Sequence, residues 1–91
     1  MPQALKDLDT ISEYIEKDSE YYAKITIQKI FFAVKQLELF PQMGRMVPEK
    51  QDPVLREILY RNYRIVYKYR DDEIYVLTVF HSSYQGRIEG L

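Results

Sequence analysis

An arginine and the chain's only histidine lie near the two ends of a strongly apolar stretch, NYRIVYKYRDDEIYVLTVFH, at residues 62–81. Arg64 carries a fixed guanidinium that can hydrogen-bond two oxygens of an anionic group. His81 can take or give a proton near neutral pH, because its unperturbed pKa is about 6.5. These two side-chain types together could stabilise negative charge and transfer a proton.

Each of these residues also has a purely structural interpretation. An arginine on a strand commonly pairs with a carboxylate, and a histidine at a strand end is commonly a simple hydrogen-bonded side chain. Glu57 could act as a base by its chemistry alone, but an ion pair with Arg56 or Arg64 is the simpler interpretation. Residue types alone therefore leave catalysis and ion pairing both open.

A catalytic role for the pair requires Arg64 and His81 to meet in space, and a β-hairpin turning at Asp71-Asp72 predicts that they do. Counting outward from a two-residue turn places Arg64 opposite Val79. It also places His81 opposite Asn62, so that Arg64 and His81 share one face as diagonal neighbours, roughly 7 to 8 Å apart at the backbone. A loop with an odd number of residues would move one side chain to the opposite face.

The elements that position these residues change from a helical to a strand pattern along the chain. Apolar residues recur at steps of three and four over about 3–17 and 20–40, which is typical of one helix face. Three later segments, VLREILY, YRIVYKY and EIYVLTVF, are rich in β-branched and aromatic residues. We expect strands over about 54–60, 63–70 and 73–80, and an irregular, proline-containing connection over 41–53.

These elements predict an α+β fold in a single domain spanning 1–91. An N-terminal two-helix hairpin has an apolar stripe to bury, and an antiparallel three-stranded β-sheet offers a face to cover. A chain of 91 residues has room for one core and no second domain.

Composition excludes several classes of site. The absence of Cys removes disulfides, thiolate nucleophiles and sulfur-ligated zinc, and a single His leaves little for an imidazole site. We therefore expect no cofactor and no metal, with only a carboxylate site left open. The sequence has no apolar run of membrane-spanning length and no signal-peptide pattern, so a cytoplasmic protein without a membrane partner is expected.

Charge is balanced overall but segregated along the chain. The formal net charge is −1 and the pI is about 5.8, which gives no strong general attraction to nucleic acid. Residues 1–20 carry six acidic side chains against two Lys, whereas residues 45–70 carry seven basic side chains against three acidic ones. An anionic partner would bind the second of these segments.

The segments ALKDLDTISEYI, LELFPQMGR, LREILYRNYRIVY and IYVLTVFH, in this order and spacing, resemble the RelE/ParE superfamily of toxins from type II toxin–antitoxin systems, of the plasmid stabilisation type. The resemblance covers nearly the whole chain. It implies a small toxin with two helices on an antiparallel sheet, neutralised by a cognate antitoxin whose gene usually lies beside it. It does not by itself give the target of the toxin.

The resemblance also suggests roles for single residues. Arg64 matches the position of an arginine thought to stabilise phosphate charge in ribosome-dependent relatives, and His81 falls where relatives vary their acid–base residue. Lys50 and Arg56 lie where those relatives concentrate basic residues, so they are candidates for RNA binding. Tyr84 falls close to a C-terminal tyrosine that orients the nucleotide in some relatives.

Two further features are structural expectations. Gly44 is expected to allow a backbone turn with positive φ, so that Arg45 caps the second helix or pairs with an acid of the first helix. Relatives usually place a short strand before the segment PQALKDL, for which this sequence has no room. Either the start of the sequence is truncated or the strand is missing. If it is missing, the family's four-stranded sheet would have three strands, and the unpaired edge could be filled by an antitoxin strand or a second copy.

Three functions follow from these observations. The first is a ribosome-dependent endoribonuclease that acts on mRNA, with Arg64 and His81 as catalytic residues, although a pI near 5.8 is low for a protein working within ribosomal RNA. The second is a non-enzymatic toxin of the ParE branch that poisons DNA gyrase, which the lack of a dense basic cluster favours. The third is an inactive antitoxin-binding or autoregulatory module.

Overall fold

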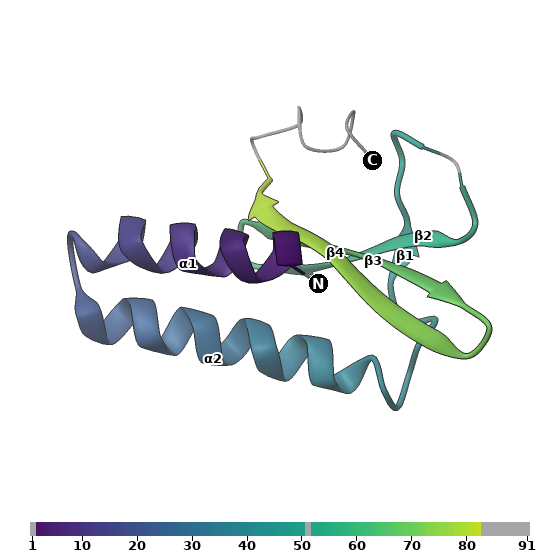
Figure 1. Ribbon diagram of the computed structural model, residues 1–91, viewed down its shortest axis with the longest axis horizontal. Helices are drawn as coiled ribbons and strands as arrows, with labels where there is room; N and C mark the ends of the chain where they lie inside the picture. Colours follow the sequence, from purple (N-terminus) through teal and green to yellow (C-terminus); the bar gives the residue numbers. More distant parts are fainter. Residues whose placement is uncertain (1, 51, 83–91) are drawn as a thin grey trace.

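Two helices precede a four-stranded antiparallel sheet in the structure, a computed structural model that describes residues 2–50 and 52–82. The elements are α1 (Pro2–Glu16), α2 (Glu20–Gln36), β1 (Arg45–Met46), β2 (Leu55–Tyr60), β3 (Tyr63–Arg70) and β4 (Glu73–His81). The helices form an antiparallel pair beside the twisted sheet (Figure 1). The predicted α+β class is confirmed.

The helices begin and end for local reasons. The Ser19 side chain accepts a hydrogen bond from the Tyr22 N–H at 3.1 Å, which caps the first turn of α2. The helix ends at Gln36, four residues short of the predicted boundary, because the next amides bond three residues back, as Leu37 does to the Val34 carbonyl. The predicted helix at 20–40 therefore finishes in tighter turns before Pro41.

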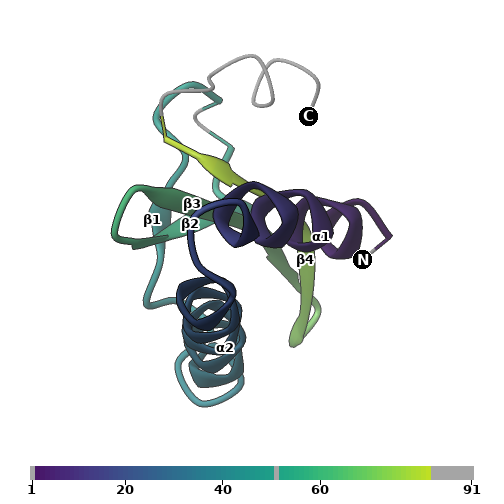
Figure 2. The ribbon, with the colours of Figure 1, turned by 90° about the vertical axis from the view of Figure 1, so that its left-hand side faces the viewer.

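The sheet is a simple meander in the order β1-β2-β3-β4. Its fourth strand was not predicted: β1 has only two residues and lies within the connection 41–53, where Arg45 pairs with Glu57 and Met46 with Arg56. Helix α1 lies against β4, and α2 lies against α1 and β2. Figure 2 views α2 nearly end-on and α1 obliquely, with α1 beside β4.

A β-bulge in β4 changes the register that we expected between β3 and β4. Tyr67 pairs with Val76, but its neighbour Val66 pairs with Thr78, so β4 contains one extra residue. Beyond the bulge, Arg64 faces Phe80, and His81 faces Tyr63. The predicted pairings of Arg64 with Val79 and of Asn62 with His81 are wrong, and Arg64 and His81 lie on opposite faces of the sheet.

The side chain of Asp7 joins α1 to β4 at this bulge. Asp7 is 5% exposed, and its carboxylate accepts hydrogen bonds from the Thr78 hydroxyl and from the Val79 N–H, the latter at 3.0 Å. The Gln3 amide donates a third bond at 2.8 Å. Next to the extra residue, the Thr78 hydroxyl and the Val79 N–H thus find their hydrogen-bond acceptor on the first helix and not within the sheet.

The two faces of the sheet carry separate apolar clusters. On the helix face, the buried residues are Ala4, Leu8, Ile30, Leu37, Ile58, Ile65, Tyr67, Val76 and Val79. On the other face, Val47 from the connection packs with Leu55, Val66 and Phe80. The connection between β1 and β2 therefore covers the face that the helices leave open, and Arg64 lies on that covered face.

Candidate functional site

Arg64 is at the centre of a buried ion-pair network on this covered face. Its Nη1 and Nη2 donate to the two carboxylate oxygens of Glu49 at 2.8 and 2.9 Å, and Nη2 also donates to Glu57. The guanidinium lies over the Phe80 ring, 5.4 Å from its centroid. Arg64 is only 6% exposed, and both of its terminal nitrogens are bound by carboxylates, whereas its buried Nε has no hydrogen-bond partner among the described residues.

Within this network, the pKa shifts of Glu49 and Arg64 both favour the charged forms. The two hydrogen bonds from Arg64 lower the pKa of Glu49 to about 2, and the bonds to Glu49 and Glu57 raise the pKa of Arg64. Glu49 therefore stays ionised and paired throughout the physiological pH range. A phosphate group could reach the guanidinium only by displacing a carboxylate that already binds it in bidentate geometry.

Glu57 is the buried residue that links this arginine to the edge of the sheet. Its side chain is fully buried, and its second oxygen accepts bonds from Arg45 Nε and Nη2 at 3.2 and 2.9 Å. The cross-strand pairing of Arg45 with Glu57 brings these two groups together. Arg45 thus pairs with an acid of β2, and the expectation that it caps α2 or pairs with an acid of the first helix is wrong.

Gly44 is required for a close approach of chain segments rather than for an unusual backbone angle. No described glycine has positive φ, so that part of the expectation is wrong. The Gly44 N–H donates to the Tyr67 hydroxyl at 3.1 Å, and this hydroxyl donates to the Pro41 carbonyl at 2.8 Å. A Cβ on Gly44 would lie 2.7 Å from the Glu57 carbonyl oxygen and 2.6 Å from the Tyr67 hydroxyl.

We expect Gly44→Ala to lower the free energy of unfolding by about 2 kcal/mol, because the methyl group would overlap a buried strand and a buried ring. Urea titration followed by circular dichroism would measure the loss. Gly44→Ala in a Tyr67→Phe background is the control, since removal of the hydroxyl relieves the shortest contact and should reduce the cost of the alanine. An alanine tolerated without loss would show that the segment can move aside.

His81 lies away from this network. It is exposed at the end of β4, and its ring meets the Tyr63 ring edge-on, with centroids 5.7 Å apart and planes at 83°. Because Tyr63 and Arg64 are adjacent on β3, their side chains point to opposite faces. The structure therefore does not bring the two predicted catalytic side chains together.

Two of the three candidates for RNA binding lie within the described residues, one in a connection and one in a strand. Lys50 is half-buried in the connection between β1 and β2. The side chain of Arg56 turns toward the segment before β1, where Nη1 donates to the Gly44 carbonyl at 2.8 Å. Tyr84 lies outside the described residues. Much of the basic excess in residues 45–70 is thus used within the protein, because Arg45, Arg56 and Arg64 all bind groups of the chain.

Comparison with known proteins identifies the family. Residues 1–86 match the family described as the ParE toxin of the type II toxin-antitoxin system parDE. The chain belongs to this family. A solved structure titled "Chromosomal ParDE TA system from P. aeruginosa" is similar, with a TM-score of 0.73, 25% identity and 89% of each chain covered. A search of curated proteins found no match. The resemblance to the RelE/ParE superfamily is confirmed.

The ParE family membership gives the general role of the chain. It is the toxin of a type II toxin–antitoxin system, and its partner is a cognate antitoxin. In the part of this ParE-family toxin that the structure describes, no cluster of three or more His, Cys, Asp or Glu side chains could hold a metal ion. No helix within residues 2–50 and 52–82 is long and apolar enough to cross a membrane.

The sequence of this ParE-family toxin does not predict that Glu49 pairs with Arg64. Glu49 lies in the irregular connection, so no periodic pattern places it against the sheet. The sequence allows an ion pair of Glu57 with Arg56 or Arg64, and the structure shows the pair with Arg64. The sequence does indicate a basic partner for Glu57, because an acid on a largely apolar strand is usually paired with a basic side chain when it is buried.

Proposed function

We propose that this toxin arrests growth by binding its target without cleaving RNA, and that the target is DNA gyrase. The observation that carries the first part is the placement of Arg64 and His81 on opposite faces of the sheet. General acid–base chemistry and phosphate stabilisation need their groups within hydrogen-bond reach of one reacting centre. The arrangement of these two residues does not provide such a centre.

The electrostatics of the chain support the same proposal. The one arginine that matches a catalytic position is held by Glu49 and Glu57, which bind both of its terminal nitrogens. The pI near 5.8 gives little attraction to ribosomal RNA. A toxin that acts by contact with a protein target requires neither a free guanidinium nor a basic surface.

Gyrase is proposed as the target because the chain belongs to the ParE branch, for which the family resemblance implies gyrase poisoning. The test is to induce the toxin and examine both RNA and DNA. We expect double-strand breaks and a DNA-damage response, with stabilised cleavage complexes when purified toxin is added to gyrase. New codon-positioned cuts in ribosome-bound transcripts would overturn the proposal in favour of a nuclease, and no growth defect would leave an inactive antitoxin-binding module.

Replacement of His81 by Gln gives a second test. His81 is exposed but its ring contacts Tyr63, so the substitution should cost less than about 1 kcal/mol of stability and leave toxicity within about twofold of the wild type. If His81 were an acid or base in RNA cleavage, toxicity should fall with a loss of activity of about 10² to 10⁴. Growth after titrated induction, with toxin levels checked by immunoblotting, would separate these outcomes, and a thermal melt would confirm that the variant is folded.

A further inference from the structure

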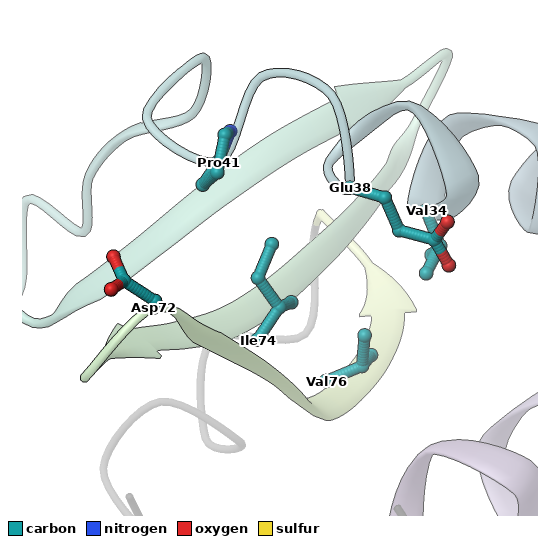
Figure 3. Close-up of a pocket in the computed structure, with 6 residues that line it drawn as sticks. All are labelled: Val34, Glu38, Pro41, Asp72, Ile74 and Val76. Carbon is teal, nitrogen blue, oxygen red and sulfur yellow. The ribbon is translucent and has the colours of Figure 1, made fainter.

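A hollow of about 360 Å³ lies between the end of α2 and the hairpin of β3 and β4. Its lining residues are Val34, Glu38, Pro41, Asp72, Ile74 and Val76. Figure 3 shows Ile74 between Asp72 on one side and Glu38 on the other, with Pro41 facing them from the segment after α2. The hollow is distant from Arg64, which lies on the opposite face of the sheet.

The chemistry of this hollow is apolar at its base and acidic at its margins. Val34, Ile74 and Val76 supply aliphatic groups, and Val34 and Ile74 remain partly exposed. The carboxylates of Glu38 and Asp72 are both on exposed residues. This combination suits an aliphatic side chain that is accompanied by a cationic group, and it repels the phosphates of a nucleic acid.

The turn that carries Asp72 is maintained at a conformational cost. Asp71 and Asp72 have positive φ values of 54° and 63°, a conformation for which Asn-Gly or Asp-Gly is preferred in two-residue hairpins. A second aspartate in place of glycine keeps a carboxylate next to the hollow. Backbone strain of this kind is commonly kept where a side chain has a function.

The segment after α2 extends the apolar surface beside the hollow. Leu39 and Phe40, which lie between Glu38 and Pro41, are 75% and 63% exposed. Two large exposed apolar side chains next to a hollow are typical of a surface that a protein partner covers. Exposed apolar groups so near in sequence to the lining of the hollow suit a peptide segment better than a small molecule, which needs an enclosed pocket.

We infer that this surface is a docking site for a segment of the cognate antitoxin that inserts an aliphatic side chain between Glu38 and Asp72 and places a Lys or Arg against their carboxylates. The antitoxin is the partner that the family membership provides. A second copy of the toxin is a poorer occupant, because symmetric docking through this surface would bring the two acidic margins together. The inference depends on the family assignment and not on gyrase as the target.

Removal of the two carboxylates tests the first part of the inference, the pairing of a Lys or Arg of the antitoxin with Glu38 and Asp72. The double variant Glu38→Gln, Asp72→Asn should weaken binding of the purified antitoxin encoded beside the toxin gene about fivefold at low salt, with a flatter salt dependence. The matched control is Glu13→Gln, Asp71→Asn, which removes the same charge from α1 and from the adjacent turn residue. Isothermal titration calorimetry at two salt concentrations measures both. Equal affinities for the wild type and the double variant would overturn the inference.

A larger side chain in the hollow tests the second part of the inference, the insertion of an aliphatic side chain of the antitoxin. Val34→Phe should occupy the space with the toxin's own ring and weaken antitoxin binding about tenfold or more, with the salt dependence unchanged. If Val34→Phe does not fold, as judged by thermal melting, the charge variant decides the question. Overlapping synthetic peptides of the antitoxin should bind only where an aliphatic residue lies close to a Lys or Arg.

The remaining outcomes assign the surface to another occupant. Variants that lose toxicity but keep full antitoxin affinity would show that the growth-inhibition target covers the surface, and the inference would be wrong. Variants that change only the sedimentation behaviour of the free toxin would show a contact between copies, with the same conclusion. Because antitoxin binding is measured without any growth assay, failure of the gyrase proposal leaves this test intact.

Discussion

Arg64→Met is expected to lower the free energy of unfolding by about 3 kcal/mol, because it removes the principal partner of a buried carboxylate. Glu57 would keep only its contact with Arg45, whose side chain is 60% exposed. The substitution also removes the guanidinium that lies over Phe80. Urea unfolding followed by both fluorescence and circular dichroism would measure the loss.

Two further variants make this prediction specific to the network. Arg70→Met is the matched control, since Arg70 is 69% exposed and its only described ion pair is a 3.7 Å contact with Asp71; it should change stability by less than about 0.5 kcal/mol. Glu57→Gln combined with Arg64→Met should cost less than the sum of the two single changes. Additive losses would show that Arg64 and Glu57 are not coupled.

This result would also guide the interpretation of toxicity data. A loss of toxicity in an Arg64 variant is ambiguous when the variant is also less stable. Toxicity should therefore be compared at a temperature where the variant is fully folded. Retained toxicity in folded Arg64→Met would agree with a contact mechanism, whereas lost toxicity together with lost transcript cleavage would restore a catalytic role for Arg64.

Asp7→Ala is expected to cost about 3 kcal/mol, because it leaves buried donors without an acceptor. The Thr78 hydroxyl and the Val79 N–H both donate to this carboxylate, and the bulge leaves the Val79 N–H directed toward α1 rather than toward a strand. The alanine would also leave a small void between α1 and β4. Thermal unfolding measured by calorimetry would detect the change as a clear drop in Tm.

Asp9→Ala is the control for this prediction, because Asp9 lies two residues away on the same helix and is exposed. It should change the free energy of unfolding by less than about 0.5 kcal/mol. Asp7→Asn should fall between the two, since its carbonyl oxygen can accept one bond while its amide opposes the other donors. A cost for Asp7→Ala no larger than that for Asp9→Ala would mean that water replaces the carboxylate.

The general architecture could be predicted from the sequence because it depends on local periodicity. Apolar residues at helical spacing and three β-rich segments were enough for the α+β class and the order of the elements. The bulge could not be predicted this way, because it is stabilised from outside the strand. Its polar groups are satisfied by Asp7, a residue 71 positions from Thr78 in the sequence.

One extra residue in β4 had a large effect on the predicted site. Counting from the turn at Asp71-Asp72 is valid only as far as Tyr67 and Val76, where the observed register shifts. Beyond that point, each residue of β4 lies on the opposite face from the partner that counting without a bulge would give it, which separates Arg64 from His81. Ion pairing of Arg64 was a stated alternative, but its bidentate partner Glu49 lies in a connection whose path depends on burial of Val47 rather than on any repeat.

The contact of Asp7 with Thr78 and Val79 has a consequence for synthesis of the toxin. The acceptor is made near the start of translation, and its donors are made 71 and 72 residues later. A nascent chain can therefore form the helical hairpin early but cannot join it to β4 until that last strand has emerged from the ribosome. The helical hairpin is therefore local in sequence, whereas its attachment to the sheet depends on a contact between the two ends of the described chain.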